Sequence, residues 1–132
     1  MESEKTCVMV DFWIVGDKFD IDQVSLQLGL TPTETRRKED FKIPEFAETE
    51  WCISTGYEES QNVMIQFQKI MDLLKEKEIA INSILTENNL KCGFGIVAKI
   101  YDSESPLMEF SRACIQFAAK INAEINFDIY PY

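Results

Sequence analysis

The chain has 132 residues, the usual size of one domain, and its apolar content of 45% suffices for one hydrophobic core. Acidic residues outnumber basic ones by 23 to 13, and the resulting net charge of −10 repels phosphate backbones, which argues against nucleic acid as the partner. The sequence contains no histidine and no glycine-rich phosphate loop, which excludes histidine-assisted nucleophiles and the common nucleotide sites.

The sequence also predicts where the protein works. No apolar run approaches the ~20 residues of a membrane span, and the acidic N-terminus is unlike a signal peptide, so we expect a soluble, cytoplasmic protein. The widely spaced cysteines are Cys7, Cys52, Cys92 and Cys114. Because none lies in a C-x-x-C pair and most lie in apolar runs, we expect reduced core thiols, with no disulfide, metal or cofactor.

The first third of the chain predicts a strand and a short helix. Residues 6–15 alternate between two faces that are both largely apolar, which is typical of a central strand. A helix over residues 21–28 is clearly marked, because Asp20 is a good N-cap, Gly29 fits the position after the helix and Pro32 prevents its continuation.

The middle of the chain predicts a long loop, a strand and two helices. Residues 31–50 are polar and charged, and a short edge strand could lie near residues 36–42. A strand follows over residues 50–56. Residues 61–74 have the apolar stripe of an amphipathic helix, which we expect to break near residues 77–80 before a second helix begins at about Ile81.

The remaining elements are a strand over residues 90–101, a helix over residues 112–121 capped by Ser111, and a last strand over residues 123–130. The order β-α-β-α-α-β-α-β predicts one α+β domain over residues 1–132. We expect a mixed or antiparallel sheet of four to five strands with helices mainly on one face, in a ferredoxin-like or related arrangement.

One face of this sheet is the predicted binding surface. Acids and aromatics point to it from the first and last strands, namely Asp11, Trp13, Glu124, Asp128 and Tyr130. Such residues can form a partner-binding patch. The alternatives are that the acids are simply solvated, that a helix or loop covers Trp13, or that neighbouring carboxylates do acid–base work.

Two further features have an open interpretation. Gly93 and Gly95 lie within a predicted strand, where they permit a close approach across the sheet or a bulge. Arg36 and Arg37, in the only basic cluster, could bind an anion or form local ion pairs with the acids around them.

The flanks of the first helix carry a family resemblance. The segments Phe12-x-Ile14-x-Gly16, Leu28-Gly29-Leu30-Thr31-Pro32-Thr33 and Trp51-x-Ile53-Ser54-Thr55, with Phe19-Asp20 between the first two and a closing Asp128-Ile129-Tyr130, resemble the bacterial domain-of-unknown-function family numbered 4279. Glu39-Asp40 stands where that family often has Gly-Asp, so this loop can differ. The resemblance implies a bacterial, cytosolic protein and defines no catalytic residue. Small acidic domains of this kind also resemble immunity proteins.

These observations predict a non-enzymatic protein-binding module, specifically an immunity protein that neutralises a basic toxin domain. The alternative is a small-ligand-sensing regulatory domain, which a well-formed pocket beside Gly93 and Gly95 would favour. An enzyme that uses carboxylates with Arg36 or Arg37 is a third possibility, and it requires Asp11 and Asp128 to meet in a cleft. The sequence leaves the oligomeric state open.

Overall fold

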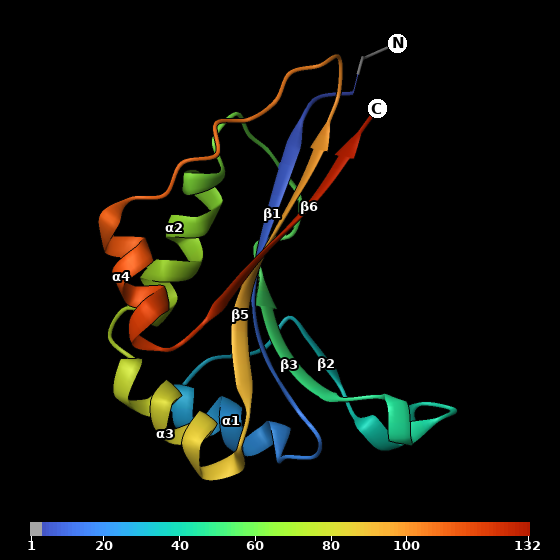
Figure 1. Ribbon diagram of the computed structural model, residues 1–132, viewed down its shortest axis with the longest axis vertical. Coiled ribbons are helices and arrows are strands. Elements are labelled where there is room, and N and C mark those ends of the chain that lie inside the picture. Colours follow the sequence, from blue (N-terminus) through green and yellow to red (C-terminus); the bar gives the residue numbers. More distant parts are fainter. Residues whose placement is uncertain (1–3) are drawn as a thin grey trace.

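A single mixed sheet forms the centre of the molecule, which the computed structural model describes over residues 4–132 (Figure 1). Within this range the strands are β1 (Cys7–Gly16), β2 (Glu34–Arg36), β3 (Thr49–Ser54), β4 (Glu58–Glu59), β5 (Lys91–Ile100) and β6 (Glu124–Pro131). The helices are α1 (Ile21–Leu28), α2 (Val63–Leu74), α3 (Glu78–Asn88) and α4 (Arg112–Lys120), with short 3₁₀ turns η1 (Lys38–Asp40) and η2 (Pro44–Phe46).

The strand order is β2-β3-β1-β5-β6, with β4 paired to β1. The pairs are antiparallel except β5–β6, which is parallel. The predicted α+β class and mixed sheet are confirmed. The predicted four to five strands are wrong, since the described residues form six, and β2 and β4 are too short to leave a clear periodic signal. The ferredoxin-like arrangement is not confirmed by this order.

The hydrophobic core lies between the sheet and the helices. The even-numbered residues of β1 and β5 are buried against the helices, and Figure 1 shows α1 to α4 on the same side of the sheet. Phe94 is central to this layer, because its ring lies 5.3 Å from that of Phe12 and 4.8 Å from that of Phe67. This packing leaves the opposite side of the sheet without a helical cover.

The helix ends follow the sequence signals closely. Asp20 caps α1 by accepting a hydrogen bond from the Gln23 amide, and Gly29 ends the helix in the left-handed conformation at φ 64°. Ser111 caps α4 in the same way. The predicted break between the two middle helices is confirmed, although α3 begins at Glu78 rather than near Ile81. Its first turn is poorly marked because Ile79 is exposed.

The segment between β2 and β3 projects away from the sheet (Figure 1). We call residues 37–48 the arm. It contains η1 and η2, and the edge strand expected near residues 36–42 lies slightly earlier, at Glu34–Arg36. Three apolar side chains of the arm are exposed, and the most exposed, at 86%, is Phe46. No helix in residues 4–132 is long and apolar enough to cross a membrane.

Candidate partner-binding face

The side of the sheet opposite the helices is the candidate site, and we call it the open face (Figure 1). Strand pairing determines which side chains share it. Asp11 on β1 lies opposite Ser54 on β3 and Gly95 on β5, and Gly95 lies opposite Asn126 on β6. Since side chains alternate along a strand, the open face carries the odd-numbered residues of β1 and β5 and the even-numbered residues of β2, β3 and β6.

Trp13 occupies the middle of the open face. It is paired with Cys52 on one side and Gly93 on the other, and its indole ring lies across Gly93. A Cβ added at Gly93 would lie 2.3 Å from Trp13 Cζ2, so only glycine accommodates this arrangement. The predicted close approach across the sheet is therefore made by Trp13. The indole is half-buried and forms a flat floor for the open face.

Three acids gather beside this floor, which we call the acidic cluster: Asp11, Glu34 and Glu50. Glu34 and Glu50 reach it because β2 pairs with β3, placing Glu34 opposite Cys52 and Arg36 opposite Glu50. Arg36 lies between them, with Nη2 3.3 Å from Glu34 Oε1 and Nε 3.7 Å from Glu50 Oε2. One cation therefore balances three carboxylates, and the cluster keeps an excess of negative charge.

The acids alter one another's protonation. Burial raises the pKa of Asp11, a hydrogen bond from Ser54 lowers it, and the nearby Glu34 raises it. Burial also raises the pKa of Glu50, against the opposing effect of Arg36. Among the residues the structure describes, Asp11 Oδ1 is buried without a hydrogen-bond partner. A cationic group from outside would satisfy this oxygen and compensate the excess charge.

Cys52 lies among these acids and is chemically inert there. Burial first, and then the surrounding carboxylates, raise the pKa of its thiol to about 12. Because the thiolate is the nucleophilic form, a thiol with this pKa is not a nucleophile at neutral pH. The cysteine of this arrangement therefore supplies no nucleophile at neutral pH, and its distinctive chemical property is the excess of carboxylates.

The structure separates the other predicted site residues from the acidic cluster. Glu124, Asp128 and Tyr130 lie on the open face, but on edge strand β6. Asp128 is two strands away from Asp11 and two residues further along, which is about 12 Å at usual strand spacing and rise. Asp11 and Asp128 therefore do not meet in a cleft, and the carboxylate pair considered for acid–base work does not form.

Sequence reasoning missed Glu34 and Glu50. The only signal was the alternation of Glu34 and Arg36 in a segment interpreted as a loop, and strand pairing alone makes it meaningful. The two arginines that were considered as an anion site have different surroundings. Arg36 is ion-paired in the acidic cluster, whereas Arg37 directly precedes η1 and has no ion pair with any residue of the described range. The two side chains therefore form no joint anion site.

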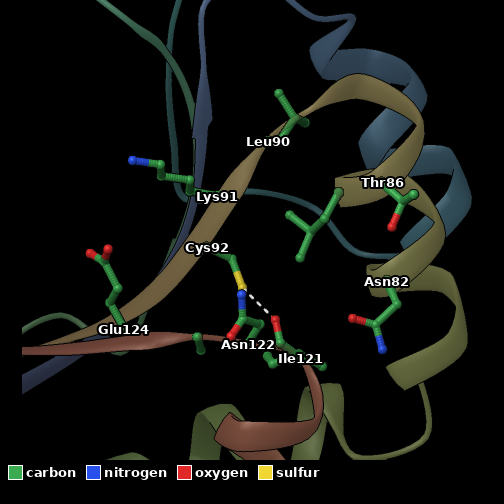
Figure 2. Close-up of a pocket in the computed structure, with 10 residues that line it drawn as sticks. Asn82, Thr86, Leu90, Lys91, Cys92, Ile121, Asn122 and Glu124 are labelled. Atoms are coloured by element: carbon green, nitrogen blue, oxygen red, sulfur yellow. Dashed lines mark hydrogen bonds between the residues drawn. The ribbon is translucent and has the colours of Figure 1, made fainter.

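A hollow lies on the helix side, between α3 and the starts of β5 and β6 (Figure 2). Its volume is about 450 Å³, and Asn82, Thr86, Cys92 and Asn122 are among its lining residues. Asn82 is already engaged, since Nδ2 donates to the Lys120 carbonyl, and Cys92 Sγ donates to the Ile121 carbonyl. The region beside Gly93 and Gly95, where a ligand pocket was considered, is instead occupied by Trp13 and Asp11.

The fold and this site together define a class: an acidic α+β domain whose mixed sheet has helices on one side and an open, negatively charged face on the other. The chain belongs to the family described as Domain of unknown function (DUF4279), which matches residues 5–132. No curated protein and no solved structure matches the chain.

Proposed function

We propose that this protein is a non-enzymatic binding module whose open face holds a basic protein, and specifically that it is an immunity protein that neutralises a bacterial toxin domain. The observation that carries the proposal is the acidic cluster of Asp11, Glu34 and Glu50 beside the flat Trp13 ring. A net charge of −10 would steer a basic partner toward this face.

The arm supplies the apolar contacts that charge alone cannot give. A hollow of about 460 Å³ separates the arm from the acidic cluster, and its lining includes Phe41 and Phe46 from the arm and Arg36 and Glu50 from the sheet. Stable interfaces commonly combine a few apolar or aromatic anchors with a charged surround. We propose that a basic side chain of the partner enters the cluster while Phe46 packs against an apolar patch of the partner.

Charge reversal tests this arrangement. The proposal predicts that a gene adjacent to this one encodes a basic toxin domain, and the binding of that domain is measured by calorimetry. Glu34→Lys places a second cation beside Arg36, and we expect a loss of affinity of roughly tenfold or more. Glu87→Lys is the matched control, because Glu87 is exposed on α3, on the other side of the sheet. Equal losses in the two variants, or affinity that does not fall with added salt, would rule out the open face.

Neutralisation needs its own assay. Cells that produce the toxin domain should survive when the wild-type chain is co-expressed and die when the Glu34→Lys variant is co-expressed at equal abundance. If the cells die with the wild-type chain as well as with the variant, only binding is left and an immunity role is excluded.

The cysteines agree with the proposed location of the protein. Four free cysteines, three of them buried, fit a reducing compartment such as the cytoplasm.

A small-ligand-sensing role is the second candidate, and the hollow of Figure 2 is what favours it. Its volume lies within the usual range for ligand pockets. The test is thermal unfolding against a panel of small polar metabolites, in wild type and in Thr86→Trp, which fills the hollow from an exposed position on α3. A stabilising metabolite whose effect disappears in Thr86→Trp would support this role, and its absence from the whole panel would end it.

A further inference from the structure

The free edge of β6 differs from the other end of the sheet. At the far end, β2 has three residues, two of which are charged, so that edge is short and protected. Strand β6 has eight residues, no basic side chain, and a proline only at its end. Phe127 and Ile129 on this strand are 44% and 42% exposed. A long edge strand with one apolar face of this kind is a template for pairing with another strand.

Backbone geometry identifies the groups that face outward. The Tyr132 amide donates to the Ile100 carbonyl, so Tyr132 faces β5. Because successive residues of a strand present their N–H and C=O groups to alternate edges, Ile125, Phe127 and Ile129 present theirs to the free edge. No hydrogen bond from the described residues, 4–132, reaches these outward groups. Pro131 also faces outward, where its missing N–H costs no bond to β5.

We propose that two copies of this chain pair through β6 in antiparallel fashion, with Phe127 of each copy opposite Phe127 of the other. The two six-stranded sheets then become one continuous sheet across a two-fold axis. The occupant of the edge is a second copy because the strand is self-complementary in this register.

The backbone fits the register. When Phe127 pairs with its own copy, Ile125 pairs with Ile129 of the second copy. All three residues present their N–H and C=O groups outward, so each pair exchanges two hydrogen bonds. On the helix side of the sheet, the pairing joins the Ile125, Phe127 and Ile129 side chains of both copies into one apolar strip.

The charges fit as well. On the open face this register places Glu124 opposite Tyr130 and Asn126 opposite Asp128, so no carboxylates oppose each other. The neighbouring registers fail here. A slip in one direction places Glu124 opposite Asp128, and a slip in the other places Asp128 opposite its own copy, which like-charge repulsion disfavours.

Salt should strengthen this association. Two chains of charge −10 repel each other at long range, and dissolved ions screen that repulsion over about 8 Å at physiological ionic strength. The proposed binding of a basic partner has the opposite salt dependence. The dimer does not rest on that function, and the two proposals can fail separately.

Sedimentation equilibrium of the full chain over a range of concentrations is the first test. We expect a dimer in the wild type that is more stable at higher salt. Ile129→Pro removes one outward N–H and no bond to β5, and it should yield a monomer, whereas the matched control Ile129→Val should remain dimeric. If Ile129→Pro fails to fold, Phe127→Lys tests the same edge by placing two lysines across the axis. A wild-type monomer under all conditions overturns the proposal, as does a dimer that persists in these variants.

Disulfide cross-linking tests the register. Asn126 and Asp128 of the second copy form a pair without hydrogen bonds, whose Cα atoms lie about 4.5 Å apart, within disulfide reach. A mixture of Asn126→Cys and Asp128→Cys proteins should cross-link under mild oxidation, and neither protein alone should do so. Cross-linking of either variant by itself indicates another register and overturns this one. A chain that stays monomeric and binds a foreign strand along β6 overturns self-pairing.

Discussion

The Trp13 indole lies across the backbone of Gly93, so closely that a Cβ at Gly93 would lie 2.3 Å from Trp13 Cζ2. The two residues face each other across the central strand pair β1–β5, on the open face. Without Gly93, the ring could not lie flat, and the floor beside the acidic cluster would be lost. This contact therefore links a stability requirement of the sheet to the shape of the proposed binding face.

The contact predicts different outcomes for two neighbouring glycines. Gly93→Ala should lower the free energy of unfolding by about 1–3 kcal/mol, because the indole must be displaced by an overpacked methyl group. Gly95→Ala is the control, since its Cβ would lie 3.9 Å from Asp11 Oδ2, an ordinary contact. Urea denaturation monitored by tryptophan fluorescence measures both. Equal effects would show that the Trp13 contact is not what requires glycine.

A partly buried hydrogen bond between α1 and β3 gives a second prediction. Trp51 is fully buried, and its Nε1 donates to Ser25 Oγ at 3.0 Å. Ser25→Ala leaves the indole N–H without its partner, and we expect a loss of about 1–3 kcal/mol in the free energy of unfolding. Ser83→Ala, at an exposed site on α3, should have little effect. If Trp51→Phe makes Ser25→Ala harmless in a double-mutant cycle, the cost is assigned to this bond.

The raised pKa of Asp11 predicts how stability depends on pH. Because the pKa is higher in the folded chain than in the unfolded chain, Asp11 favours folding most below its unfolded value of 3.8, and this contribution is lost as pH rises through the folded pKa. Asp11→Asn should therefore raise the melting temperature relative to wild type at neutral pH, and the difference should shrink in acid.

Glu58 is the control of opposite sign. Hydrogen bonds from Lys69 and Gln66 lower its pKa, so its contribution is present above the unfolded value of 4.5 and is lost as pH falls through the lowered value. Glu58→Gln should destabilise the protein at neutral pH and converge with wild type in acid. Thermal melts across this range test both variants, and parallel trends for the two would contradict the assignment.

The cysteines should differ sharply in reactivity. Burial is the main cause that raises the pKa of both Cys52 and Cys92 to about 12, whereas Cys7 is half-buried at the start of β1. In the native protein at neutral pH, iodoacetamide should modify Cys7 first and leave Cys52 and Cys92 unmodified until unfolding. Peptide mass spectrometry reads out the order, and a Cys7→Ser protein should lose the fast modification. Early modification of Cys52 would mean that the packing around this residue is readily lost in the native protein.

Local sequence signals determined most of the elements of this protein. The cap at Asp20 and the left-handed Gly29 set the ends of α1, and the pattern of residues 6–15 correctly predicted a central strand, because caps and periodicity depend only on neighbouring residues. Only tertiary structure decided the strand order and the pairing of β2 with β3. That pairing brings Glu34 and Glu50 to Asp11, and it joins residues far apart in the chain. The aromatics and acids of β1 were predicted from sequence, but their partners depended on register, which local patterns do not specify when a strand is only three residues long.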